Sequence, residues 1–69
     1  MARFELEQDG IVVATVDGPR DSSLLEIIHY GVVYGQDRPC VANEVRGRKR
    51  IKVATFPSTP SPGAAGGGR

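Results

Sequence analysis

The sequence contains one cysteine, Cys40, so no disulfide can form within the chain. Small secreted domains usually depend on several disulfides, because their cores are too small to hold the fold alone. No apolar run approaches the roughly 20 residues that span a bilayer, and the N-terminal residues lack the apolar stretch of a signal peptide. We therefore expect a cytoplasmic protein without a membrane segment.

Residues that could carry chemistry are also scarce. Cys40 and His29, the only histidine, give two potential metal ligands, whereas a zinc site normally uses three or four. The three aspartates of the N-terminal half lie where turns and helix starts favour this residue, at positions 9, 17 and 21. The Gly-rich C-terminus lacks the Lys-Ser/Thr of a phosphate-binding loop. We predict no catalytic residue, no metal and no cofactor, and hence a binding protein instead of an enzyme.

The length of 69 residues allows one domain. Residues 57–69, PSTPSPGAAGGGR, contain no aliphatic side chain larger than alanine, a composition that predicts a disordered tail. Residues 1–56 then form a single compact domain. Because a domain of this size buries only ~60% of its unfolded surface, it has little room for a deep catalytic cleft.

The N-terminal residues predict a β-hairpin. Phe4–Glu7 alternates apolar and acidic side chains, and Ile11–Val16 is rich in β-branched residues. Asp9-Gly10 between them favours a two-residue turn, which pairs Leu6 with Val13. The core face of this hairpin should then contain Phe4, Leu6, Ile11 and Val13.

The middle of the chain predicts a helix over Leu24–Tyr34. Ser23 and Glu26 have the spacing of a capping box, in which each side chain bonds the other residue's backbone amide. A broad apolar face follows at helical spacing, formed by Leu24, Leu25, Ile27, Ile28, Gly31 and Val32. Glycine inside a helix costs up to ~1 kcal/mol relative to alanine, so Gly31 indicates a close approach of the helix to a sheet.

A second hairpin is predicted from Val41–Arg46 and Arg50–Phe56. A two-residue turn would pair Glu44 with Ile51 and mix the two faces, so we favour a three-residue loop, residues 47–49. This register pairs Val45 with Ile51 and Val41 with Thr55, and it directs four polar side chains away from the core, namely Glu44, Arg46, Arg50 and Lys52. The expected fold is α+β, with β-β-α-β-β order and one helix on one face of a four-stranded, mainly antiparallel sheet. The predicted core contains Phe4, Leu6, Ile11, Val13, Leu24, Ile28, Val32, Val41, Val45, Ile51 and Val53.

The net charge of +1 conceals a marked asymmetry. Residues 1–37 carry seven acids and two bases, whereas residues 38–69 carry seven bases and one acid. Five cations lie on the second predicted hairpin: Arg46, Arg48, Lys49, Arg50 and Lys52. This polarity either serves recognition of a partner or lets the two halves neutralise each other across the sheet.

Two surfaces are candidates for binding. The cations of the second hairpin could meet an acidic protein surface or the phosphates of a nucleic acid, although no aromatic residues are interleaved to stack on bases. The outer face of the helix presents Glu26, His29, Tyr30 and Val33, and tyrosine is favoured in protein interfaces.

The segments VDGPR, residues 16–20, and HYGVVYGQD, residues 29–37, resemble small uncharacterised phage and prophage proteins that join an acidic hairpin to a helix. In size and lack of catalytic groups the chain is also similar in type to anti-CRISPR proteins and other small phage inhibitors. The resemblance implies a monomeric or weakly dimeric accessory protein that inhibits a host protein or nucleoprotein complex, for example a CRISPR-Cas complex. A nucleic-acid-binding module and a phage structural or assembly component are the alternatives.

Overall fold

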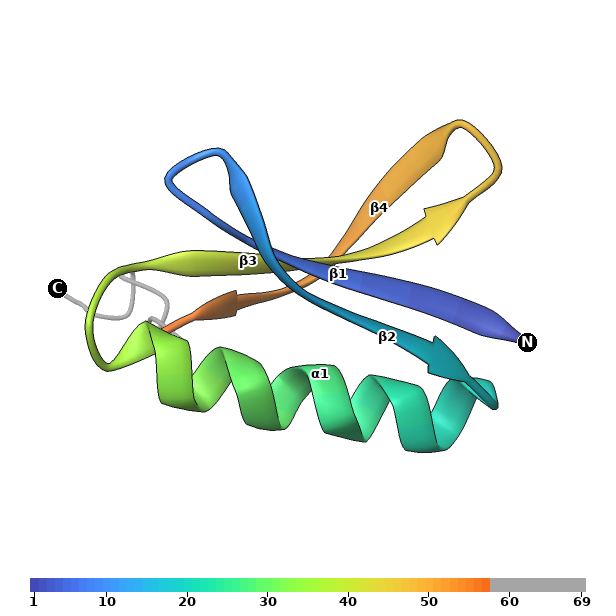
Figure 1. The fold of residues 1–69 in the computed structure, drawn as a ribbon, viewed down its shortest axis with the longest axis horizontal. Helices are drawn as coiled ribbons and strands as arrows, with labels where there is room; N and C mark the ends of the chain where they lie inside the picture. The colour runs from blue at the N-terminus through green and yellow to red at the C-terminus, as the bar shows by residue number, and fades with distance from the viewer. Residues whose placement is uncertain (58–69) are drawn as a thin grey trace, which may run out of the picture.

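The computed structural model describes residues 1–57, so the predicted tail lies outside the described residues apart from Pro57. The elements are β1 (Ala2–Gln8), β2 (Ile11–Gly18), α1 (Arg20–Gly35), β3 (Cys40–Arg46) and β4 (Lys49–Phe56). The strands form one antiparallel sheet in the order β2-β1-β3-β4, and α1 covers one of its faces (Figure 1). The predicted α+β fold of two hairpins around one helix is confirmed.

The first hairpin begins as predicted and then shifts its register. Asp9 and Gly10 both have positive φ, 56° and 78°, as a type I′ turn requires. Beyond the turn, Val13 is an extra residue in β2, and Leu6 therefore pairs with Ala14 and not with Val13. Such a β-bulge exchanges the faces of the residues that follow it.

The bulge decides which residues of β2 reach the core. Phe4 pairs with Val16, so Val16 is buried, whereas the unbulged register would have placed Thr15 there. The prediction that Ile11 belongs to the core is wrong, since this residue is 65% exposed beside the turn.

The second hairpin has the two-residue turn that the sequence analysis rejected. Gly47, with φ 59°, and Arg48 form the turn, and Glu44 pairs with Ile51. Val53 is then an extra residue in β4, which restores the predicted pairing of Val41 with Thr55. The bulge brings Phe56 to the helix side of the sheet, where an unbulged strand would present Thr55.

This register corrects several predicted faces. Glu44 and Arg46 lie on the helix side, because paired residues share a face and Glu44 is opposite the core residue Phe4. Arg50 and Lys52 lie on the open face as predicted, opposite Val45 and Asn43. Three residues of the predicted core are wrong because they lie on the open face or are exposed: Val41, Val45 and Ile51.

The core forms between α1 and the three strands β1, β2 and β3, with one contribution from the end of β4. Its buried apolar residues are Phe4, Leu6, Val16, Ile27, Cys40, Ala42 and Phe56. Four predicted core residues pack against its margin, namely Val13, Leu24, Ile28 and Val53. The prediction that Val32 belongs to the core is wrong, because Val32 and Leu25 remain exposed; the apolar face of α1 is broader than the sheet that covers it.

The helix starts one turn earlier than predicted, at Arg20, and the Ser23 capping box is wrong. Pro19 occupies the N-cap position without a side-chain hydrogen bond. Ser23 is instead buried in the first turn beside Gly18, where a Cβ on residue 18 would approach the serine Oγ to 2.8 Å. Position 18 therefore has no room for a side chain, and Ser23 serves packing and not capping.

Gly31 explains how β4 is attached to the helix. A Cβ atom at this position would overlap the Phe56 ring, which lies against the bare backbone of α1. The predicted close approach of helix and sheet at Gly31 is therefore confirmed.

We predict that Gly31→Ala destabilises the fold, although the same change in an unobstructed helix gains up to about 1 kcal/mol. The added methyl group must displace the Phe56 ring, and overpacking of this kind costs about 1–3 kcal/mol. Urea unfolding measures the difference. Val33→Ala, on the exposed side of the same helix, is the control and should change stability little. A gain of stability in Gly31→Ala would contradict the packing of Phe56 on the helix.

Two neighbouring isoleucines test which side of α1 faces the core. Ile27 is fully buried, whereas Ile28 lies at the margin of the core. Ile27→Ala should cost about 2–5 kcal/mol, and Ile28→Ala should cost clearly less because its site is already open to water. Equal losses in thermal or urea unfolding would show that the helix is rotated from the orientation described.

Candidate functional site

The five cations predicted as a binding cluster all lie on the β3–β4 hairpin, but they divide into two groups. Arg46 pairs with Glu44 at 3.5 Å and Arg50 pairs with Glu5 at 3.0 Å. Within residues 1–57, the other three form no ion pair: Arg48, Lys49 and Lys52. The cations without an ion pair in this part of the chain therefore all lie on one hairpin, whose turn projects away from α1 (Figure 1).

The cations outside this hairpin in residues 1–57 are all paired with carboxylates, and some pairs cross between the two halves of the sequence. Arg50 bonds Glu5 across the open face, and Arg38 bonds Asp9 next to the first turn. Both contacts join the acidic N-terminal half of the sequence to its basic C-terminal half. The interpretation that the two halves neutralise each other across the fold thus holds for these pairs, and it leaves the unpaired cations of the β3–β4 hairpin as the exception.

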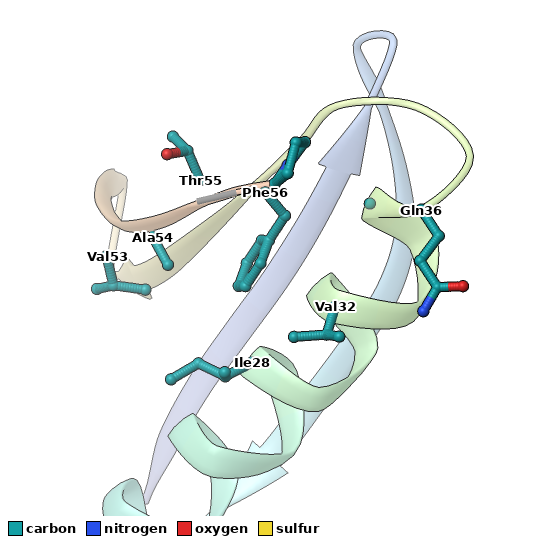
Figure 2. A pocket seen from close by; sticks show the side chains of 9 residues that line it. Ile28, Val32, Gln36, Val53, Ala54, Thr55 and Phe56 are labelled. Atoms are coloured by element: carbon teal, nitrogen blue, oxygen red, sulfur yellow. The ribbon is translucent and has the colours of Figure 1, made fainter. Parts of the chain in front are cut away.

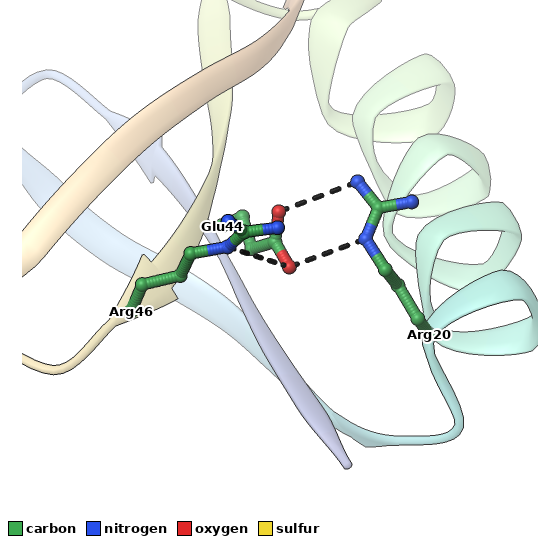
Figure 3. Close-up of polar contacts among 3 residues, drawn as sticks. All are labelled: Arg20, Glu44 and Arg46. Carbon is green, nitrogen blue, oxygen red and sulfur yellow. Dashed lines mark hydrogen bonds and ion pairs between the residues drawn. The ribbon is translucent and has the colours of Figure 1, made fainter.

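A buried carboxylate joins the start of the helix to β3. Figure 3 shows Glu44 between the guanidinium groups of Arg20 and Arg46. Arg20 donates from Nε and Nη2 to the two carboxylate oxygens, each at 3.3 Å, and the Glu44 side chain is only 7% exposed. The hydrogen bond from Arg20 is the main cause that holds the pKa of Glu44 below its ordinary value, and the charges of Arg20 and Arg46 add to this effect against the cost of burial.

The sequence analysis placed Glu44 on the outer face and so missed this cluster. The only signal for the cluster in the sequence was the pairing of Glu44 with Ile51 that a two-residue turn implies. This pairing puts a carboxylate on the apolar face, which is unfavourable without a cation nearby. The cation, Arg20, comes from a distant part of the chain, so the local pattern does not reveal it.

We predict that Glu44→Gln lowers stability at neutral pH and that the deficit disappears in acid. Because the folded pKa is lowered, the ionised carboxylate stabilises the fold above the ordinary pKa of glutamate, and this contribution is lost as the pH falls through the folded value. Urea unfolding from about pH 7 to about pH 3 measures the effect.

Arg20→Gln provides the matching control for this contact. The double variant should lose less stability than the sum of the two single variants, because both changes remove the same interaction. A deficit in Glu44→Gln that stays constant over the whole pH range would contradict the role of the charged carboxylate.

An apolar groove lies between α1 and β4. It has a volume of about 780 Å³, and its apolar lining consists mainly of Ile28, Val32, Val53, Ala54 and Phe56. Figure 2 shows Ile28 and Val32 directed from the helix toward the strand, with the Phe56 ring between the two elements. The groove exists because Phe56 holds the end of β4 against the helix while the rest of the strand diverges toward its turn (Figure 1).

The second predicted surface, the outer face of α1, is exposed as expected. Glu26, His29, Tyr30 and Val33 are all accessible to solvent. The rings of His29 and Tyr30 meet edge to face with centroids 6.3 Å apart. This face and the cationic turn lie on different elements, and the structure does not bring them together into one site.

Cys40 is placed against the helix backbone. Its Sγ lies 3.6 Å from the carbonyl oxygen of Gly31, and burial raises the pKa of the thiol. A protonated, buried thiol is a poor nucleophile, and His29 is exposed on the helix surface. Among residues 1–57, no group of three or more His, Cys, Asp or Glu side chains is arranged to hold a metal ion.

The described part of the chain also contains no helix that is both long and apolar enough to cross a membrane. Comparison with protein-family models, curated proteins and solved structures gives no match for this chain. The function must therefore be argued from the surface of the molecule itself.

Proposed function

We propose that this chain is a small non-enzymatic binding protein that recognises an acidic surface on another protein through its β3–β4 hairpin. The resemblance to small phage proteins makes a host protein or nucleoprotein complex in the cytoplasm, such as a CRISPR-Cas or other defence complex, the class of target to test. Binding would inhibit the target by covering an acidic surface that the target uses for its own partner.

The observation that carries this proposal is the group of three cations without ion pairs on the β3–β4 hairpin, Arg48 in its turn and Lys49 and Lys52 on β4. Elsewhere in residues 1–57 the arginines are held by carboxylates. Cations that lack a partner within the molecule are available for one outside it, and complementary charge speeds association and selects the partner. Ile51, exposed on the same strand, adds apolar area beside them.

A protein partner is favoured over nucleic acid by the balance of charge. Residues 1–57 contain eight of the nine cations and all eight carboxylates, so they have no net positive charge to attract a long phosphate backbone. Three free cations would neutralise at most about three phosphates, which gives a salt slope of roughly 2.7 log units per tenfold change in salt. The hairpin also carries no aromatic ring before Phe56, which is buried.

The proposal is tested with the double variant Arg48→Glu/Lys52→Glu. Both side chains are exposed and unpaired within residues 1–57, so the fold should persist while capture of a protein from nuclease-treated bacterial lysate falls at least about tenfold, a loss of 1.4 kcal/mol. The control compares two single variants, Arg48→Glu and Arg38→Glu, because the second makes the same change in net charge beside the first turn, where Arg38 bonds Asp9.

Fluorescence anisotropy with short duplex and single-stranded DNA separates the two partner classes. We expect no binding at low salt. Submicromolar, salt-sensitive binding that Arg48→Glu/Lys52→Glu abolishes would replace the protein partner by nucleic acid. Protein capture that is unchanged in this variant would refute the hairpin as the binding surface.

A further inference from the structure

The groove between α1 and β4 continues into apolar side chains that the single chain leaves uncovered. Leu25 is 69% exposed and Val32 is 52% exposed, and Ile28 lies between them along the helix. Their spacing of i, i+3 and i+7 forms the narrow stripe by which one helix packs against another. On the opposite wall, Val53 and the exposed Ile51 extend the apolar surface along β4.

The edges of the sheet are poorly suited to association by strand addition. β2 and β4 are the two edge strands, and each contains a bulge, at Val13 and Val53. β4 also carries Lys49, Arg50 and Lys52. Bulges and lysines are features that prevent edge-to-edge pairing, so the groove is better suited to receive a helix than the edge is to receive a strand.

The charges around the groove indicate what kind of helix it accepts. The lining of the groove is uncharged, but beyond it, where the helix side of the sheet continues toward the β3–β4 turn, three cations and one carboxylate leave a net charge of +2: Arg20, Arg46, Lys49 and Glu44. On α1 itself, Asp21 lies one turn before Leu25 on the side of the apolar stripe and forms no ion pair within residues 1–57. A helix with an apolar stripe and an acidic residue at its start therefore complements the groove and the cations beyond it, and α1 of a second copy has both properties.

We propose that two copies of this chain associate through this surface, with α1 of each copy seated in the groove between α1 and β4 of the other. A two-fold axis along the groove buries both apolar stripes at once, because the same helix forms a wall of one groove and fills the other. The sequence of residues 58–69 contains no leucine, isoleucine or valine that could form a matching apolar stripe. Arg48 at the turn and Lys52 on the open face stay outside this contact, so Arg48→Glu/Lys52→Glu leaves the dimer surface unaltered, whereas Lys49 and Ile51 lie on the helix side and belong to both proposed surfaces.

Sedimentation equilibrium of the full chain, from about 10 µM to about 1 mM, tests the dimer across the corresponding range of dissociation constants. We expect a shift from monomer to dimer with concentration. Val32→Asp should weaken the dimer at least about tenfold, because the carboxylate would be buried without a partner. The control is Val12→Asp, which alters a valine of similar exposure, 41%, on the open face of β2, and it should dimerise like the unaltered chain.

NMR spectra of the backbone amides of the 15N-labelled chain, recorded at increasing protein concentration, locate the contact. The same spectra of Val32→Asp show whether this variant is folded. Signals of Ile28, Val32 and Val53 should move with concentration, while those of Val12 and Thr15 stay fixed. A chain that remains monomeric at the highest concentration overturns the proposal. A dimer that survives Val32→Asp, or one whose moving signals lie on the open face, overturns it as well.

Discussion

The contact between Phe56 and the backbone of Gly31 is the constraint on which the rest of the structure depends. It attaches the last strand to the helix at one point, and it requires both a residue without a side chain in α1 and a bulge at Val53 that turns Phe56 inward. Because Phe56 ties β4 to the helix near the end of the strand, the remainder of β4, which stays paired with β3, can follow the twist of the sheet away from the helix. The groove and the projecting turn both result from this divergence.

The second connection between helix and sheet is polar. Glu44 on β3 accepts hydrogen bonds from Arg20 at the start of α1, so the two ends of the helix are joined to the sheet by different interactions. A buried carboxylate is acceptable here because guanidinium groups on both sides compensate its charge and satisfy its oxygens. The cost is that an arginine of the basic hairpin, Arg46, is used within the fold and is less available for a partner.

Charge compensation also defines the surface. Ion pairs engage most of the arginines of residues 1–57 and leave the unpaired cations on one hairpin, while the unpaired acids Asp21 and Glu26 remain on the helix. The apolar groove lies between these two regions, on α1 and β4. A domain with a core this small cannot cover the whole apolar face of its helix, and the uncovered part forms a surface that a second copy can bury.

The elements that depend on neighbouring residues were determined by the sequence alone. Asp9-Gly10 specified its turn through positive φ, the apolar spacing specified the helix, and Gly31 indicated a close contact. Tertiary structure decided the positions of the two bulges. Each bulge lets one side chain reach the helix, Val16 in β2 and Phe56 in β4. The alternation of apolar and polar residues along a strand does not show which of its side chains a distant helix will bury. Tertiary structure also decided the position of Glu44, because its burial requires an arginine 24 residues away in the sequence. It decided the exposure of Leu25 and Val32 as well, because the path of β4 determines how much of the helix face a single chain covers.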